Sequence, residues 1–148
     1  MVFQKLKMKF KVFLDSTVFI YSFERPNSNS RKIIGLLNEN KIIAVTSTRV
    51  IKEVTKYFEY FYNLELARKF RKYIINSSIA VPENLVKDFM HKLKGKIKEK
   101  DLEQLAVVRK FHIKYLVAYD RDFKNIEEYR TPKEFIKIFG LKAAESEF

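Results

Sequence analysis

The chain has 148 residues, of which 47% are hydrophobic and 32% are charged, a balance typical of a globular protein rather than a disordered one. Lys and Arg number 30 against 18 Asp and Glu, and the resulting net charge of +12 would attract a polyanion such as a nucleic acid. The chain contains no cysteine, which excludes disulfides and thiolate metal sites and fits a cytoplasmic location.

The N-terminal residues combine basic and apolar side chains. Lysines alternate with apolar residues over positions 5–12, a period of two that predicts an exposed edge strand. A basic and then apolar start resembles a signal peptide, but Asp15 ends the apolar run and no small-residue cleavage site follows. No segment reaches the roughly 18 uninterrupted apolar residues that a membrane span needs, so we expect no membrane partner.

The remaining pattern alternates short apolar runs with amphipathic segments. Strands are predicted at residues 11–15, 41–47, 77–82 and 113–120. Helices are predicted at residues 28–40, 47–62, 64–75, 83–93, 101–111 and 131–140. The last helix has the clearest bounds, with Thr131 as cap, Pro132 in the first turn, Glu134 completing a capping box and Gly140 at the end.

Strands that alternate with helices predict an α/β protein with a mainly parallel sheet covered on both faces. Neither an internal repeat nor a linker interrupts the pattern, so we expect one domain over residues 1–148. In such sheets ligands bind at the carboxyl ends of the strands. Polar residues that follow a strand are therefore the first candidates for a functional site.

Four acidic residues are predicted to meet at that edge of the sheet. Asp15 and Asp120 each end an apolar strand, whereas Glu53 and Asp101 lie near the starts of helices, at the margin of the apolar face. Carboxylates gathered at one edge repel one another unless a cation compensates them. Oxygen ligands of this kind favour Mg²⁺ or Mn²⁺, and a pair of such ions is a common device for phosphodiester hydrolysis.

Each acid also has a purely structural interpretation. Asp15 and Asp101 could be helix caps, and Asp101 has Gln104 at capping-box spacing. Glu53 could pair with a neighbouring basic residue (Arg49, Lys52 or Lys56), and Asp120 could begin a turn.

Four ordered motifs resemble those of PIN-domain proteins, and of the toxin-type, VapC-like ribonucleases among them. "FLDSTVFI" is similar to the opening motif of the family, and "TSTRVIKEV" to the second, in which a strand leads into a helix bearing Glu. "KDLEQLAVV" and "YLVAYDRDF" resemble the third and fourth motifs, and "TPKEFIKIFG" resembles the C-terminal helix. The resemblance extends over residues 10–141.

The resemblance implies a three-layer α/β/α sandwich with a central, mainly parallel sheet, and a metal-dependent endoribonuclease activity. By position, Asp15, Glu53, Asp101 and Asp120 would be the catalytic acids that bind Mg²⁺ or Mn²⁺. Asp122 would be an accessory metal ligand, and Thr17, or Ser16, would place a hydroxyl near the phosphate. The resemblance further implies RNA as substrate, a homodimer, and a small antitoxin protein as partner.

The chain departs from the family pattern at two places. Ala118 stands where many relatives have Thr or Ser, and the Lys-rich segment 83–100 aligns poorly, although its lysines suggest a contact with the RNA backbone. The aromatic residues over positions 57–62 spread over more than one face of the predicted helix, and those that cannot pack on the sheet suggest a dimer or antitoxin contact. Two alternative functions stay open: a non-catalytic RNA-binding module, and an RNA-processing or DNA-acting nuclease of the same fold.

Overall fold

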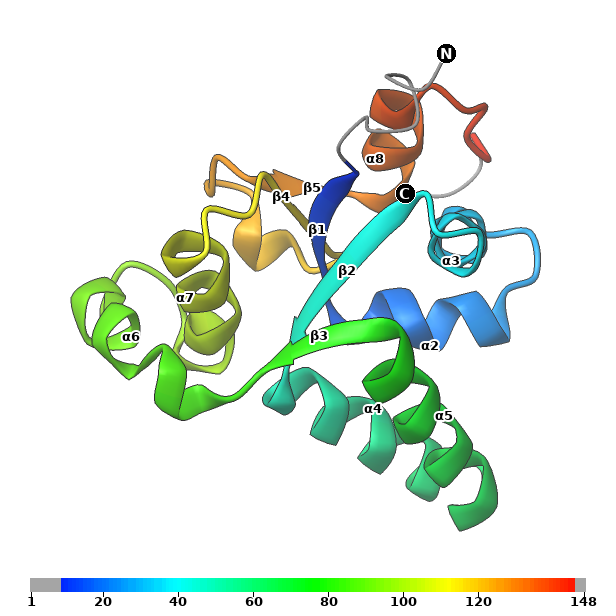
Figure 1. Ribbon diagram of the computed structural model, residues 1–148, viewed down its shortest axis with the longest axis horizontal. Helices are drawn as coiled ribbons and strands as arrows, with labels where there is room; N and C mark the ends of the chain where they lie inside the picture. The colour runs from blue at the N-terminus through cyan, green and yellow to red at the C-terminus, as the bar shows by residue number, and fades with distance from the viewer. Residues whose placement is uncertain (1–8, 146–148) are drawn as a thin grey trace, which may run out of the picture.

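The computed structural model describes residues 9–145 (Figure 1). The strands are β1 (Phe10–Leu14), β2 (Ile42–Ser47), β3 (Ser78–Val81), β4 (Tyr115–Val117) and β5 (Tyr129–Arg130). The α-helices are α2 (Ser16–Glu24), α3 (Asn29–Asn38), α4 (Thr48–Phe61), α5 (Leu64–Ser77), α6 (Lys87–Leu93), α7 (Leu102–Lys110) and α8 (Pro132–Phe139). Short 3₁₀ turns are η1 (Glu83–Leu85), η2 (Glu99–Asp101) and η3 (Arg121–Phe123).

The five strands form one sheet in the order β3-β2-β1-β4-β5, and every neighbouring pair is parallel. Helices α6 and α7 lie on one side of the sheet, and α2, α3, α4, α5 and α8 lie on the other (Figure 1). The predicted α/β/α sandwich with a parallel sheet is therefore confirmed. Because all strands run the same way, the segments that leave β1, β2 and β4 emerge at one edge.

The first strand is the centre of the sheet and not its edge. Val12 of β1 is paired with Ala44 of β2 on one side and with Tyr115 of β4 on the other. The prediction of an exposed edge strand is wrong for its described part, and residues 5–8 lie outside the described residues. Alternating lysines indicated solvent contact, but only the start of β1 is exposed, whereas Val12 and the two residues after it are buried.

The fourth strand is shorter than predicted. β4 ends at Val117, so Asp120 lies three residues beyond the strand rather than at its end. The chain turns there because η3 begins at Arg121, directly after Asp120. β5 was not predicted, since two residues are too few to show a periodicity.

Side chains at the helix starts explain where the helices begin. Ser28, Ser47 and Asn63 each accept a hydrogen bond from a backbone N–H in the first turn of α3, α4 or α5. The predicted capping box of α8 is present, with Thr131 and Glu134 bonding each other's backbone N–H groups. α8 ends at Gly140, whose φ of 95° lies in the left-handed region.

The aromatic residues at the end of α4 divide between core and surface. Phe58 is fully buried and stacks on Phe70 of α5 with ring centroids 4.2 Å apart. Tyr57 and Tyr62 donate hydrogen bonds to the same carboxylate oxygen of Glu24, at 2.7 and 2.8 Å. Phe61 is 61% exposed, and the end of α4 that carries it projects away from the sheet (Figure 1).

The C-terminal segment is attached to α3 through a buried amide. Asn29 is fully buried; its Nδ2 donates to the carbonyl of Ala144 at 3.1 Å, and its Oδ1 accepts from the Ala144 N–H at 2.7 Å. Among the described residues, no helix combines the length and the apolar character that crossing a membrane requires.

Candidate acid-lined active site

Asp15 occupies the point where the central strand becomes a helix. Its backbone N–H donates to the Val117 carbonyl at 3.1 Å, which joins the ends of β1 and β4. The residue is 6% exposed, and its Oδ1 is buried without a hydrogen-bond partner. Asp15 stands at the N-cap position of α2, but its side chain makes no capping hydrogen bond. Helix capping therefore does not explain why a carboxylate is buried here.

Burial, together with the charges of the nearby carboxylates of Glu53, Asp101 and Asp120, raises the pKa of Asp15 from 3.8 to about 7. The hydrogen bond with the Ser16 backbone works in the opposite direction. A carboxyl group in this position is partly protonated at neutral pH in the metal-free protein. A cation beside it would stabilise the ionised form.

Glu53 reaches the same place from α4. Its Oε1 is buried without a hydrogen-bond partner, and its Oε2 lies 4.0 Å from Arg49 Nε, one turn earlier. Burial raises the pKa of Glu53, and the charge of Arg49 opposes that shift. The pairing with Arg49 that the sequence left open is thus present, but it leaves one carboxylate oxygen free of hydrogen bonds.

Asp101, Asp120 and Asp122 form a cluster in which carboxylate oxygens, one from each residue, lie within 4.8 Å of one another. Asp101 is 3% exposed and precedes α7, yet its side chain makes no capping hydrogen bond and Gln104 Oε1 has no partner. The capping-box alternative is therefore wrong. Asp120 Oδ1 accepts from the Asp122 N–H at 2.9 Å, so Asp120 does begin a turn, while its Oδ2 accepts from Lys100 Nζ at 2.7 Å.

These side chains converge on one cavity of about 290 Å³. Its lining comprises Asp15, Ser16, Thr17, Glu53, Lys100, Asp101, Gln104, Tyr119 and Asp120. Thr17 Oγ1 is buried and has no hydrogen-bond partner. Of the predicted site residues, only Asp122 is absent from the lining, and it contacts the cavity through Asp120 and Lys100.

Lys100 is a member of the site that sequence reasoning missed. Its Nζ lies 2.7 Å from Asp120 Oδ2 and 3.2 Å from both Asp101 Oδ2 and Asp122 Oδ2. Lys98 Nζ lies 3.1 Å from Asp122 Oδ1. Both lysines thus contact acids of the site, and their contact with the RNA backbone stays a prediction. Their alternation directly before Asp101 was the available signal.

The donor set fits a hard divalent cation. The cavity offers carboxylate oxygens with no His nitrogen, and Asp15 Oδ1 and Glu53 Oε1 are buried oxygens without hydrogen bonds. Mg²⁺ and Mn²⁺ favour ligands of this kind and keep several waters of their own. The residues present therefore fit the metal that the resemblance implies.

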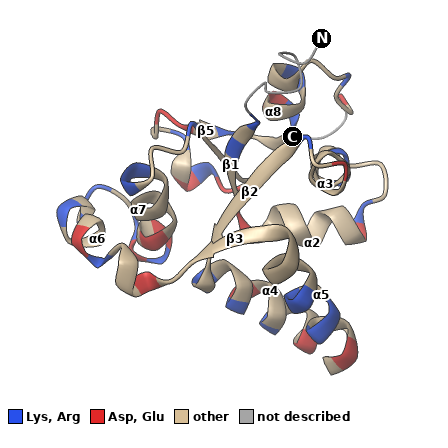
Figure 2. Cartoon of the chain, in the orientation of Figure 1, with Lys and Arg blue, Asp and Glu red and all other residues tan. Residues whose placement is uncertain are grey.

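A polar groove of about 320 Å³ adjoins the cavity and shares Glu53 with it. Its other lining residues are Thr48, Arg49, Lys52, Lys56, Glu83 and Glu103. Three of these are cations from successive turns of α4, along which Figure 2 shows basic residues. Glu103, which the sequence gave no reason to single out, is 4% exposed and accepts from the Arg49 N–H at 3.3 Å.

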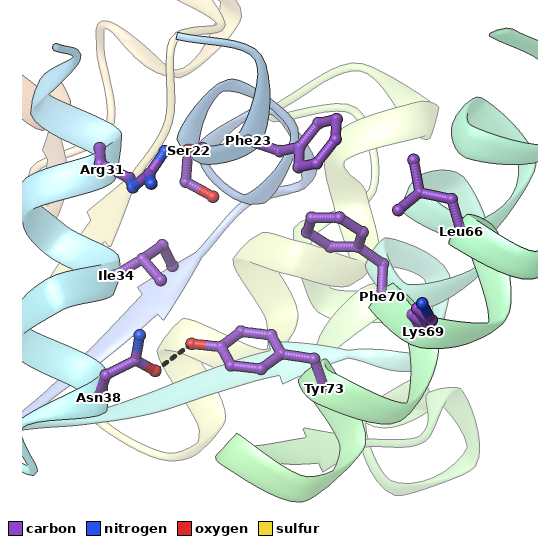
Figure 3. A pocket seen from close by; sticks show the side chains of 9 residues that line it. All are labelled: Ser22, Phe23, Arg31, Ile34, Asn38, Leu66, Lys69, Phe70 and Tyr73. Atoms are coloured by element: carbon purple, nitrogen blue, oxygen red, sulfur yellow. Dashed lines mark hydrogen bonds between the residues drawn. The ribbon is translucent and has the colours of Figure 1, made fainter. Parts of the chain in front are cut away.

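A separate apolar groove of about 370 Å³ lies between α2, α3 and α5 (Figure 3). Phe23, Ile34, Leu66 and Phe70 line it, and Arg31 and Lys69 stand at its margin. Tyr73 donates a hydrogen bond to Asn38 Oδ1 across one end. Phe23 lies near the end of α2 that is remote from Asp15, so this groove is distinct from the acid-lined cavity.

Comparison with solved structures identifies the architecture. The VapC20 toxin of Mycobacterium tuberculosis, described as cleaving the sarcin-ricin loop, is 16% identical with a TM-score of 0.58, over 78% of this chain and 97% of that one. A toxin–antitoxin complex from Klebsiella pneumoniae matches at 17% identity and a TM-score of 0.65, over 83% and 98%. The chain has the PIN-like fold of the VapC toxins.

A third PIN-like match is VapBC2 from Rickettsia felis, a complex solved with a DNA fragment from its promoter, at 14% identity and a TM-score of 0.61, over 82% and 98%. In sequence, the chain is 38% identical over 72 residues to an uncharacterised protein of Methanocaldococcus jannaschii. That segment spans 49% of this chain and 42% of the relative. No protein-family model matches the chain. The comparisons thus establish the fold, and function has to be argued from the site.

Proposed function

We propose that the chain is a metal-dependent endoribonuclease, the toxin of a toxin–antitoxin pair. The observation that carries the proposal is the acid-lined cavity: Asp15, Glu53, Asp101 and Asp120 come from separate segments and meet at the carboxyl edge of a PIN-like sheet. Asp15 and Asp101 are buried carboxylates, with Glu53 and Asp120 partly exposed beside them, and a bound divalent cation would offset the cost of bringing these like charges together.

Asp15, Glu53, Asp101 and Asp120 would hold Mg²⁺ or Mn²⁺, with Asp122 as accessory ligand. When bound, the metal would supply activation of water and stabilisation of the charge on the leaving oxygen. Asp15 would release its proton, because a ligand to a metal has to be ionised. The unpartnered Thr17 hydroxyl would donate a hydrogen bond to a non-bridging phosphate oxygen. Hydrolysis in this arrangement leaves a 5′-phosphate and a 3′-hydroxyl.

The RNA strand would enter along the polar groove on α4. Arg49, Lys52 and Lys56 line a groove that continues from the cavity at Glu53. Cations spaced along a groove bind the phosphate backbone of a single strand without reading its sequence. The formal charge of +12 would draw RNA toward a site whose own side chains are acidic.

The antitoxin would be a small protein that inserts apolar side chains into the groove of Figure 3. An apolar groove with Arg31 and Lys69 at its margin suits an amphipathic segment that also carries acidic residues. A homodimer and a cytoplasmic location belong to the same proposal, by analogy with the VapC toxins. The exposed Tyr60 and Phe61 would offer the dimer or the antitoxin a further apolar contact.

One cleavage experiment tests the proposal against its alternatives. The purified chain is incubated with single-stranded RNA, duplex DNA and single-stranded DNA in Mn²⁺, and in EDTA. We expect cleavage of RNA within the strand in Mn²⁺, none in EDTA, and recovery when Mn²⁺ is restored. Binding of RNA without cleavage in any metal would favour the non-catalytic module, and preferential cleavage of DNA would favour the DNA-acting nuclease.

A further inference from the structure

The strongest unexplained feature of the site is the position of one ammonium group. Lys100 Nζ lies within 3.2 Å of an oxygen from each of Asp101, Asp120 and Asp122. These are the same three residues whose oxygens approach one another within 4.8 Å. One ammonium group therefore contacts all three of the acids that could hold a metal ion, whereas Lys98 contacts one of the three, Asp122.

The ammonium and a divalent cation compete for the same oxygens. Oδ1 of Asp120 accepts a hydrogen bond from the Asp122 N–H in the η3 turn. The other oxygen, Oδ2, accepts from Lys100 Nζ at 2.7 Å. A metal ligated by Asp120 would approach that oxygen to about 2.0–2.1 Å if it were Mg²⁺. Two cations at such a distance repel each other, so the ammonium has to move when the metal binds.

Lys100 is able to make that movement. Its side chain is 50% exposed and projects from η2, a short turn at the end of the Lys-rich segment 83–100. Asp101 is 4% exposed at its side chain and is held by the start of α7. The flexible partner in this cluster is thus the lysine, whereas the carboxylate is fixed by the fold.

We propose that Lys100 is an internal counter-ion of the acid site: its ammonium keeps Asp101, Asp120 and Asp122 together before metal loading and leaves them when a divalent cation binds. This inference rests on the proposed function, because it takes the acid cluster to be a metal site. It further predicts that Lys100 lowers the affinity of the site for metal, since each binding event has to break the contacts of Lys100 with the three acids.

The consequence for metal binding has a definite sign. Replacing Lys100 with an uncharged residue removes both the competing contacts and the repulsion of the incoming cation, so the site should bind metal more tightly. A change of tenfold in affinity corresponds to about 1.4 kcal/mol, and half-exposed ion pairs are worth about this much or less. We therefore expect a gain on the order of tenfold.

The test is a titration of the whole chain with Mn²⁺ by calorimetry, comparing wild type with Lys100→Met and Lys96→Met. Lys96 belongs to the same Lys-rich segment, and its side chain has no carboxylate contact within residues 9–145. Its replacement removes the same charge without touching the cluster. We expect the dissociation constant of Lys100→Met to fall on the order of tenfold below that of Lys96→Met.

An affinity of Lys100→Met that equals or falls below that of Lys96→Met would overturn the counter-ion role and leave the metal site intact. Absence of Mn²⁺ binding in all three proteins would overturn the metal site itself, and the counter-ion role with it. The two failures are therefore distinguishable.

A second measurement needs no variant and covers the case in which Lys100→Met does not fold. Wild-type protein is acetylated briefly with and without Mg²⁺, and modification is quantified by mass spectrometry. The ammonium that leaves the cluster becomes accessible, so the ratio of modification at Lys100 to that at Lys96 should rise several-fold with Mg²⁺. An unchanged or lower ratio would overturn the proposal.

Discussion

The backbone N–H of Asp15 donates to the carbonyl oxygen of Val117 at 3.1 Å, so the residue that follows β1 is bonded directly to the last residue of β4. Asp120 follows Val117 by three residues and turns back toward the same cavity. The hydrogen bonding of the sheet therefore fixes the position of Asp15 relative to the segment that carries Asp120.

Asp15→Asn should abolish RNA cleavage while leaving the protein folded. The amide cannot supply a negative charge to a divalent cation, and loss of a metal ligand should lower the rate on the order of 10³-fold or more. The measurement is the initial rate of RNA cleavage in Mn²⁺, with circular dichroism to check folding. Asp88→Asn is the matched control, because Asp88 is an exposed acid paired with Lys110 and lies outside the cavity. Equal rates in wild type and Asp15→Asn would remove Asp15 from the site.

The affinity for Mn²⁺ should rise with pH up to about 7 and then level off. The pKa of Asp15 is about 7 in the metal-free protein, so below that pH a proton has to leave before the carboxylate can bind metal. The dissociation constant measured by calorimetry between pH 5.5 and 8 should therefore fall by up to about tenfold per pH unit before it levels off. An affinity that stayed constant across this range would mean that the buried carboxyl group does not take part.

The metal-free protein should lose stability as the pH rises from about 4 to about 7. Within that window folded Asp15 keeps its proton while the unfolded chain, with a pKa near 3.8, has lost it, so rising pH favours unfolding. Asp15→Asn has no such proton and should be more stable than wild type at pH 7.5 in EDTA, by roughly 2–4 kcal/mol. Urea unfolding of both proteins at several pH values measures this difference. The idea fails if their stability profiles against pH run parallel.

Removing two lysines from the polar groove should weaken RNA binding and its dependence on salt. With Asp15→Asn as background to prevent cleavage, the double change Lys52→Ala and Lys56→Ala should reduce the slope of log affinity against log salt by roughly 1 to 1.5. The control double change, Arg71→Ala and Lys72→Ala, removes the same charge from exposed positions of α5 outside the groove. Identical slopes for the two double variants would place the RNA elsewhere.

Two phenylalanines of α4 should differ sharply in their contribution to stability. Phe58→Ala removes a fully buried ring that stacks on Phe70, and it should lower the free energy of unfolding by about 3–5 kcal/mol. Phe61→Ala alters a ring that is 61% exposed and should change the same quantity by less than about 0.5 kcal/mol. Chemical unfolding of the metal-loaded proteins measures both values. Comparable losses would mean that Phe61 is covered in solution, as a partner contact would require.

The sequence predicted the elements well wherever local chemistry decides them. The capping box at Thr131, the helix start at Ser28 and the break at Asn63 each depend on side chains next to the backbone groups that they bond. The central position of β1 could not be read in the same way, because strand order is decided by pairing with residues far along the chain. Lysines near its start indicated an edge only because they remain exposed there.

The candidate site shows the same division. Burial of Asp15 could be expected from its apolar neighbours. An uncompensated charge is costly in such surroundings, so an acid there indicates a functional role. The alternating lysines before Asp101 were the one signal for Lys100, but its contact with Asp120, twenty residues along the chain, depends on how η2 folds. Glu103 faces the groove from an apolar helix, and its bond to the Arg49 backbone joins α7 to α4 across the sheet edge.

The paired hydrogen bonds between Asn29 and Ala144 limit how far the protein can be shortened. A version ending before residue 144 would remove both of these hydrogen bonds from the Asn29 side chain, a loss on the order of 0.5–1.5 kcal/mol for each bond. A purification tag should therefore be added after residue 148 through a flexible spacer, and it should not replace residue 144 or the residues after it. Proteolytic trimming of this tail during preparation would yield a product that melts earlier although its acids are untouched.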